Sequence, residues 1–352
     1  MSGIIYLEDG TIYKGEGFGA KGTIVGELDF NTSMIGYQEV LEDSSNAGLI
    51  LNMTYPWIGN YGVKDSGKKA YAKGIIVKAV TEEPSNYECN KTLIEYMKER
   101  GIVGIKDVDT RAITRKIRRD NVMKCVITNE DLSEEELKER IKEDIEYNLI
   151  EECSIKEIEK IEGNDLNIGI LDLGQKDRVL EVLEGKNLGF TLFPYNTTKK
   201  EIDKEKVDAI IVTNGPGLAS EMVDTIETVK ELAKDYAIFG ISLGHQIISI
   251  ALGAKVRKMT YGHRGSNHGV YDYNKNRAFI VPQNHGYVID ENSLAGLDLK
   301  VSHINLNDST IEGIEHNSLN IQSIQFELEK ESDLANTSYI LNSFIDSIRE
   351  GK

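Results

Sequence analysis

The chain has 352 residues, with 58 acidic against 41 basic side chains and a formal net charge of −17. A chain of this length exceeds one ordinary hydrophobic core and predicts two domains. The acidic balance argues against nucleic acid as the main partner, because phosphate contacts require clustered lysine and arginine. Since no apolar run approaches the roughly 20 residues that span a bilayer, we also expect no membrane partner.

The three cysteines, Cys89, Cys125 and Cys153, have neither metal-ligand nor disulfide spacing. Isolated thiols of this kind are typical of a reducing compartment. The first ten residues also lack the basic stretch and long apolar core of a signal peptide. We therefore expect a cytoplasmic protein, and the sequence gives no reason to expect a bound metal.

Residues 1–150 predict a β-rich domain with frequent glycines. A hairpin is expected at residues 8–10, since the Asp-Gly pair accepts the positive φ of a tight turn. Helices are predicted at 89–100 and at 133–146, the second opened by a serine cap. Residues 151–165 are charge-dense and weakly apolar, and we interpret them as a linker.

In residues 166–352 the hydrophobic pattern differs from that of the first half, because apolar strands alternate with helices. Strands are expected at 166–171, 190–193, 207–213 and 237–241, and helices at 177–183 and 221–233. This alternation predicts an open, mostly parallel sheet with helices on both faces. Short β segments should follow, including 255–259 and 269–273, with a polar turn at 282–287 and a closing helix at 337–349.

The stretch Gly240-Ile241-Ser242-Leu243-Gly244 lies between an apolar strand and an apolar helix pattern. Strand, sharp turn and helix form the geometry that raises one side chain above a sheet, at a helix N-terminus. Small residues flank the turn because a Cβ would collide in so tight a bend. Ser242 is therefore the candidate nucleophile. The glycines of the loop 213–217 can direct backbone N–H groups toward it, as an oxyanion hole requires.

These loops together resemble the class I, triad-type glutamine amidotransferases, and the first half resembles the domain specific to the small subunit of carbamoyl-phosphate synthetase. The stretches that carry the resemblance are 7–10, 30–39, 54–60, 107–111, 214–217, 239–246, 262–268, 282–287 and 305–308. They span nearly the whole chain. The resemblance implies an α/β protein in which a β-rich N-terminal domain precedes a class I glutamine amidotransferase domain.

In the family that the sequence resembles, the small subunit hydrolyses glutamine and passes ammonia to a large subunit. The large subunit uses ATP and Mg²⁺ to make carbamoyl phosphate from bicarbonate, for arginine or pyrimidine synthesis. The resemblance thus implies a large synthetase subunit and glutamine as partners, and no cofactor in this subunit. It implies glutamine contacts at Ser45, Gly215, Gly217, Leu243, Gln246, Asn284, Gly286 and Tyr287.

The family's catalytic pattern is altered in this sequence. The family uses an elbow cysteine as nucleophile, a histidine as base and a glutamate that orients the histidine. Ser242 stands at the cysteine position, Glu327 at the histidine position, and Glu329 keeps the acid position. A serine hydroxyl needs a base to become a nucleophile, whereas a thiol is partly ionised near neutral pH. We therefore expect weak or absent glutaminase activity. A single laboratory substitution would not explain both changes.

Two other functions fit parts of the sequence. The chain could act without catalysis, as a glutamine-binding or purely structural partner of an ammonia-dependent large subunit. The Gly-x-Ser-x-Gly elbow also matches serine hydrolases, whose triad could be completed by Asp290 or Asp308 with His316. That pentapeptide often occurs by chance, and serine hydrolases lack the other two loops. For His245, His263, His268 and His285 we expect structural roles.

Overall fold

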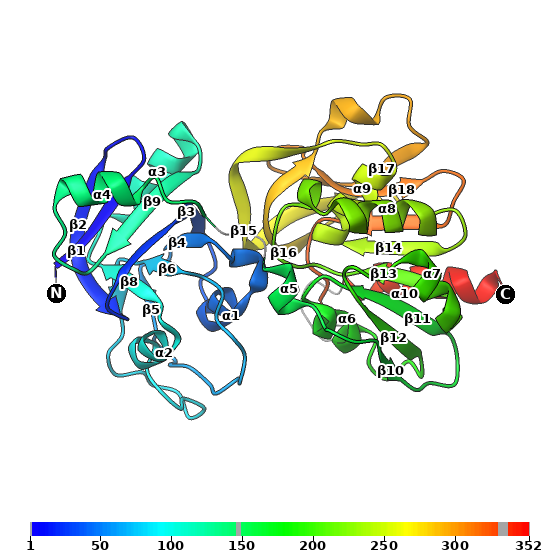
Figure 1. Ribbon diagram of the computed structural model, residues 1–352, viewed down its shortest axis with the longest axis horizontal. Helices are drawn as coiled ribbons and strands as arrows, with labels where there is room; N and C mark the ends of the chain where they lie inside the picture. Colours follow the sequence, from blue (N-terminus) through cyan, green and yellow to red (C-terminus); the bar gives the residue numbers. More distant parts are fainter. Residues whose placement is uncertain (1, 146–148, 330–336, 352) are drawn as a thin grey trace. The chain divides into compact units, whose positions relative to one another are not determined.

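The computed structural model describes residues 2–145, 149–329 and 337–351. The chain forms two compact units, whose elements are labelled in Figure 1. The first unit comprises Met1–Tyr147 with Thr260–Gly265, and the second comprises Asn148–Met259 with Ser266–Lys352. Among the described residues, no helix is both long and apolar enough to cross a bilayer.

The first unit is built on a sheet that closes on itself, in the strand order β1-β2-β8-β6-β4-β3-β9, with β9 paired to β1. The strands are β1 (Ser2–Leu7), β2 (Ile12–Gly19), β3 (Thr23–Asn31), β4 (Leu49–Met53), β6 (Gly74–Ile76), β8 (Val103–Lys106) and β9 (Met123–Thr128), with β5 (Trp57–Ile58) and β7 (Ala79–Val80) as a separate pair. The helices are α1 (Tyr37–Glu42), η1 (Ser44–Asn46), α2 (Leu93–Arg100), α3 (Thr110–Asp120) and α4 (Glu134–Arg140). This confirms the predicted β-rich N-terminal domain.

Local sequence signals set the boundaries of these elements. Gly10 has φ 85°, as the predicted hairpin turn requires. The helix expected over 89–100 begins only at Leu93, because Thr92 forms a capping box that starts the helix there. Ser133 caps α4 as predicted, but α4 ends at Arg140. Residue 146, the predicted end of that helix, lies outside the described residues.

A buried ion pair joins the segment Thr260–Gly265 to the rest of the first unit. The Nε of Arg264 lies 2.8 Å from Oδ2 of Asp29, and both side chains are almost fully buried. The same carboxylate oxygen accepts a hydrogen bond from the N–H of Gly262 at 3.1 Å. The guanidinium also reaches Oδ1 of Asn46, at 3.4 Å. The charge of Asp29 is therefore compensated without water.

The second unit contains one sheet, in the order β10-β12-β11-β13-β14-β19-β18-β17-β15-β16 (Figure 1). The strands are β10 (Glu159–Ile161), β11 (Asn167–Asp172), β12 (Gly189–Pro194), β13 (Ala209–Val212), β14 (Ala237–Ile241), β15 (Val256–Asp272), β16 (Arg277–Ile289), β17 (Leu299–Asn305), β18 (Ile311–His316) and β19 (Ile321–Ile324). The central neighbours β12, β11, β13, β14 and β19 run parallel. The predicted open, mostly parallel sheet is confirmed in this central part.

Two hydrophobic clusters cover opposite faces of this sheet. Along β11, Ile168 and Ile170 belong to the cluster that includes α6 and α10, while Leu171 belongs to the cluster of α7, α8 and α9. Both faces are buried, which explains why the parallel strands read as continuous apolar runs. The helices of the unit are α5 (Ile150–Cys153), α6 (Lys176–Val182), α7 (Lys199–Ile202), η2 (Asp203–Glu205), η3 (Ala219–Glu221), α8 (Val223–Leu232), α9 (Leu243–Ala251), η4 (Glu291–Leu294) and α10 (Ser338–Glu350).

Three stretches differ from the sequence-based expectation. The stretch 151–165 carries most of α5 and all of β10, and β10 pairs antiparallel with β12. The segments 255–259 and 269–273 are parts of one long strand, β15. The predicted polar turn at 282–287 is wrong, because these residues lie within β16. Val281, Gln283 and His285 are buried and the residues between them are less so, which is the two-residue period of a strand. Two of these three buried side chains are polar.

We expect the buried Asp29–Arg264 pair to contribute to the stability of the first unit. Arg264→Met leaves the buried carboxylate without its cation, and we expect a loss of about 3–5 kcal/mol in the free energy of unfolding, measured with denaturant. Asp107→Asn, which removes a partner from the exposed Lys78–Asp107 pair, is the control and should leave stability unchanged. Equal effects of both substitutions would contradict this account.

Candidate functional site

Ser242 occupies a strained turn between β14 and α9. Its φ of 49° and ψ of −102° are unusual for a residue with a side chain and cost about 1–3 kcal/mol. The N–H of Ser242 donates to the carbonyl of Ile324 at the end of β19, at 2.8 Å. The carbonyl of Ser242 accepts from Gln246 N at 3.1 Å, which begins the helix. The predicted strand–turn–helix elbow is therefore present.

The glycines around Ser242 allow α9 to lie very close to the sheet. A Cβ on Gly240 would stand 2.4 Å from Cδ1 of Ile248, and one on Gly244 only 2.2 Å from the carbonyl oxygen of Val212. The second contact is to backbone, which cannot move aside. The predicted need for small residues in the turn is confirmed at both positions.

The side-chain amides of Gln325 and Gln246 form a hydrogen-bonded series that begins at the Ser242 hydroxyl. Gln325 Nε2 donates to Ser242 Oγ at 3.3 Å, and Gln325 Oε1 accepts from Gln246 Nε2 at 3.1 Å. Gln246 Nε2 also lies 3.3 Å from the carbonyl oxygen of Tyr287. The structure thus brings together Ser242, Gln246 and Tyr287, three of the predicted site positions. The linking residue, Gln325, was not in the predicted set.

Gly215 and Leu243, two predicted contacts from different loops, meet at the side chain of Asn214. Oδ1 of Asn214 accepts hydrogen bonds from the backbone N–H of Gly215 at 2.8 Å and of Leu243 at 3.2 Å. Gly215 must lack a Cβ, which would stand 1.9 Å from the carbonyl oxygen of Leu173. Gly217, with φ 100°, follows in the same loop. The predicted role of this loop in directing N–H groups toward the elbow is consistent with this geometry.

Glu327 contacts the same asparagine from its other side. Asn214 Nδ2 donates to Glu327 Oε1 at 2.6 Å and to Gln175 Oε1 at 3.2 Å. The backbone N–H of Glu327 donates to the carbonyl of Pro282 at 3.1 Å. Glu329, two residues further, donates its N–H to Oγ1 of Thr337 at 2.8 Å. Sequence reasoning missed Asn214 and Gln175 as site residues, although both follow the carboxyl ends of parallel strands.

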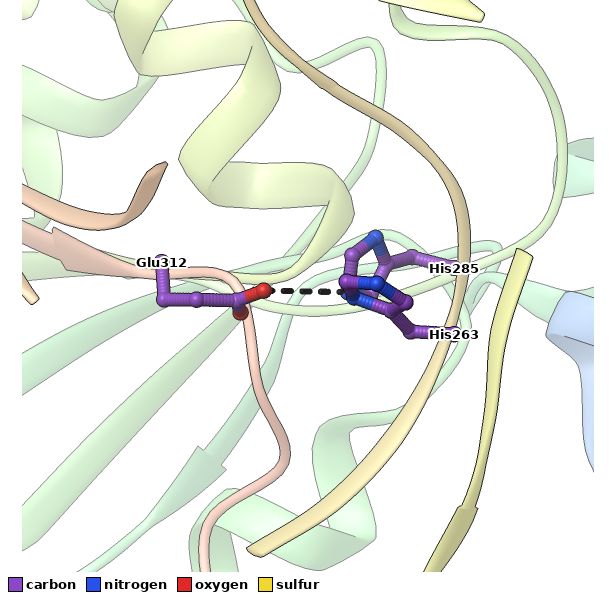
Figure 2. Close-up of side chains that lie close together, drawn as sticks. All are labelled: His263, His285 and Glu312. Carbon is purple, nitrogen blue, oxygen red and sulfur yellow. Dashed lines mark ion pairs between the residues drawn. The ribbon is translucent and has the colours of Figure 1, made fainter. Parts of the chain in front are cut away.

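The remaining predicted contacts lie on other elements. Asn284 and Gly286 are on β16, next to His285. The ring of His285 faces two partners: its Nδ1 lies 3.0 Å from the carbonyl oxygen of Tyr287, and its Nε2 lies 3.7 Å from Oε1 of Glu312 (Figure 2). Ser45 is in η1 of the first unit, where its N–H donates to Oδ1 of Asp43 at 2.8 Å.

Two further histidines, His245 and His303, are buried. His245 follows the elbow on α9, and its Nδ1 lies 2.8 Å from Oγ of Ser323. Complete burial lowers the pKa of His245 to about 3. Burial also lowers the pKa of His303, whose Nδ1 lies 2.9 Å from Oγ of Ser302. These contacts support the predicted structural role of His245.

His316 lies at the opposite end of the sheet from Ser242. In the register of the strands, Glu315 of β18 pairs with Gln322 of β19, and Ile321 of β19 pairs with Ile238 of β14. His316 is therefore level with the start of β14, about four residues or roughly 13 Å before Ser242. Its Nδ1 accepts hydrogen bonds from the N–H groups of Ser318 and Leu319.

The aspartates proposed for a hydrolase triad also have local structural roles. Asp290 accepts from the N–H of Asn292 at the start of η4, and Asp308 accepts from the N–H of Thr310. With His316 at the other end of the strands, a Ser242–His316 dyad is not formed. The geometry gives the serine hydrolase alternative no support.

Known proteins match the chain over nearly its full length. Residues 5–127 match the family model "Carbamoyl-phosphate synthase small chain, CPSase domain", and residues 170–347 match "Glutamine amidotransferase class-I". The carbamoyl phosphate synthase small chain of Clostridium acetobutylicum is 46% identical over 350 residues, covering 98% of this chain and 100% of the relative. The small chain of Fusobacterium nucleatum is 41% identical, covering 98% and 97%. That of Staphylococcus haemolyticus is 38% identical, covering 99% and 96%.

The chain belongs to the carbamoyl phosphate synthase small-chain family. The resemblance read from the sequence is thereby confirmed, together with the class I glutamine amidotransferase domain in the second half. The glutamine site that the resemblance implies at the elbow and its two neighbouring loops stays a prediction. Within that predicted site, Ser242 and Glu327 stand at the positions where the resemblance implies a cysteine and a histidine.

The low pKa of His245 predicts a pH-dependent stability. Between pH about 6.5 and about 3, the unfolded chain binds a proton at this histidine and the folded chain does not. Unfolding therefore takes up a proton, and the free energy of unfolding falls as pH falls, by up to about 1.4 kcal/mol per pH unit. His245→Asn should flatten this slope in denaturant titrations at a series of pH values. An unchanged slope would show that His245 is not held neutral.

Proposed function

We propose that the chain works as the small subunit of a carbamoyl phosphate synthase, associates with a large subunit, and has weak or no glutaminase activity of its own. The observation that carries the proposal is the pair of contacts at Ser242 and Glu327. The Ser242 hydroxyl accepts a hydrogen bond from the amide of Gln325, and the Glu327 carboxylate is bonded to Asn214. These contacts support the proposal, because neither places an imidazole beside the Ser242 hydroxyl.

The chemistry of acyl transfer explains the expected loss. A serine must give its proton to a base as it attacks, and general-base assistance contributes about 10²–10⁴-fold in rate. His285, His245 and His303 have ring nitrogens bound to Tyr287, Ser323 and Ser302 respectively. With a poorer nucleophile and no imidazole in the triad position, the amide of glutamine would be cleaved very slowly.

The glutamine contacts implied by the family are retained as residue types, and we propose that they still bind glutamine. Gly215, Gly217, Leu243, Gln246, Asn284, Gly286 and Tyr287 belong to this set. The hydrogen bonds of Gln246 to Tyr287 and Gln325 support the proposal, because they fix the side chain before any ligand arrives.

The function is tested by carbamoyl phosphate formation with the large subunit of the same organism. We expect product with ammonia, and little or none with glutamine, because the large subunit then depends on free ammonia. Purification of the two subunits as one complex is the accompanying measurement. Rapid turnover with glutamine that Ser242→Ala abolishes would overturn the proposed loss of activity.

A gain-of-function variant tests the chemical reason. Ser242→Cys together with Glu327→His restores the family's nucleophile and base, and we expect glutamine hydrolysis to rise by about 10²-fold or more. Ser242→Cys with Glu327→Gln is the matched control, since it supplies the thiol without an imidazole. If the control is as active as the histidine variant, the missing base is not the cause.

Glutamine binding can be measured separately by isothermal titration calorimetry. The wild-type chain should release heat with glutamine, and Gln246→Leu should weaken the interaction at least about tenfold, because a buried hydrogen-bonding group is lost. Asparagine, one methylene shorter, serves as the control ligand. The absence of any heat with wild-type protein would leave the chain with a structural role only.

A further inference from the structure

The side-chain oxygen of Asn214 accepts hydrogen bonds from two backbone N–H groups beside the elbow. The N–H groups of Gly215 and Leu243 both donate to its Oδ1, at 2.8 and 3.2 Å. The N–H of Leu243 is in the first turn of α9, where backbone N–H groups have no partner within the helix. Two N–H groups that converge on one oxygen beside the nucleophile position are the arrangement that stabilises the oxyanion of acyl transfer.

The orientation of the Asn214 side chain is fixed from its far end. Nδ2 donates to the carboxylate of Glu327 at 2.6 Å and to Gln175 Oε1 at 3.2 Å. A hydrogen bond to an ionised carboxylate is shorter and stronger than one between neutral groups. Because both partners of Nδ2 are acceptors, Oδ1 necessarily faces the two backbone N–H groups. Asn214 is almost fully buried, so water does not compete for these contacts.

The backbone around Asn214 is held firmly. Thr213 Oγ1 accepts from the N–H of Leu173 at 2.8 Å and donates to the carbonyl of Asn214 at 3.0 Å. Gly215 is packed so closely against Leu173 that a Cβ there would overlap the backbone. The backbone N–H groups therefore stay in place, and opening the two donors requires rotation of the Asn214 side chain. Glu327 and Gln175 both oppose this rotation, and the contact to Glu327 is the shorter of the two.

We propose that Asn214 and Glu327 form an intramolecular latch, in which the asparagine carboxamide closes the oxyanion hole of this subunit. The proposal deepens the function proposed above and rests on it. Asn214 acts as an internal mimic of the side-chain amide of glutamine, and Glu327 holds the mimic in place. The carboxylate at the histidine position therefore has a positive structural effect in addition to the loss of a base.

The latch predicts a slower reaction with unchanged binding, even where no base is involved. An oxyanion hole acts on the tetrahedral adduct rather than on the bound substrate, so the latch should slow reaction without changing binding. A thiol at position 242 would still react slowly with a carbonyl group as long as the latch is closed. Releasing Asn214 should accelerate that reaction even in the absence of any imidazole.

The test is the rate at which a glutamine-like chloroketone alkylates a thiol at the elbow. In the Ser242→Cys variant the thiolate first adds to the ketone carbon, and the resulting oxyanion is the group that the two N–H donors would stabilise. The sulfur then displaces chloride from the neighbouring carbon while the first C–S bond breaks and the carbonyl re-forms, which leaves a stable thioether that mass spectrometry detects. We expect Ser242→Cys with Glu327→Ala to show a maximal labelling rate at least about tenfold above that of Ser242→Cys, since the two donors become free. The reagent concentration for half-maximal rate should stay unchanged.

Glu327→Gln is the matched control within the Ser242→Cys background. Its amide oxygen keeps an acceptor for Asn214 Nδ2 but removes the negative charge, so labelling should stay as slow as in the parent. Equal acceleration by Gln and Ala would show that charge at the thiol is responsible, and would overturn the latch. No acceleration in either variant, where the parent is labelled, would overturn it as well.

Hydrogen exchange of the amides of Gly215 and Leu243 gives a second measurement that needs no ligand. Both amides should exchange at least about tenfold faster in Glu327→Ala than in wild type or Glu327→Gln, with equal thermal stability of the three proteins confirming the fold. Unchanged exchange would overturn the latch. Faster exchange without any chloroketone labelling would support the latch and locate the failure in the proposed glutamine site.

Discussion

The backbone conformation of Ser242 is the constraint on which the second unit depends. A residue with a side chain adopts φ 49° and ψ −102° only when its surroundings enforce it. The carbonyl of Ile324 holds the N–H of Ser242, and Gly240 and Gly244 allow α9 to approach β13 and β14 at backbone contact distance. The elbow therefore requires that β14, β19 and α9 pack in one arrangement. The loops at the carboxyl ends of these strands are positioned as a result.

The polar interior of the site is composed largely of carboxamides. Asn214, Gln246 and Gln325 each have a hydrogen-bond donor and an acceptor. Asn214 donates to Glu327, Gln246 donates to Gln325, and Gln325 donates to the hydroxyl of Ser242. Buried groups of this kind must be fully hydrogen-bonded, since an unmet donor or acceptor costs about 1–3 kcal/mol. The site is thus ordered without a ligand. Any ligand that binds by hydrogen bonds must replace contacts that already exist.

Much of this arrangement could be predicted from the sequence, because apolar periodicity and turn chemistry are local signals. The alternation of strands and helices after residue 166 gave the parallel sheet, and the small residues around Ser242 gave the elbow. A strand was expected over 277–282, but its continuation to Ile289 was missed because Gln283 and His285, not apolar residues, occupy the inward positions there. Polarity then suggested a turn where the backbone is extended.

The contacts inside the site could not be predicted in this way. Asn214 and Glu327 are 113 residues apart, and the parallel pairing of β13 with β14 and of β14 with β19 brings their loops to the same edge of the sheet. The sequence shows a carboxylate at position 327. It does not show which group the carboxylate contacts, because that depends on the rotamers of Asn214 and Gln175. Glu327 therefore has a hydrogen-bond partner, Asn214, that its place in the sequence does not indicate.

The inward-facing polar residues of β16 have a consequence for strand register. Gln283 Oε1 accepts a hydrogen bond from Asn305 on β17 at 3.3 Å, and His285 lies beside the fully buried Glu312 of β18. A slip of one residue would turn Asn284 and Gly286 inward in place of Gln283 and His285. Asn305 would then face a shorter side chain, and Glu312 would lose the imidazole beside it. Purely apolar residues would tolerate such a slip more easily, since hydrophobic contact has no direction. Gln283 and His285 thus help to specify how this edge of the sheet aligns.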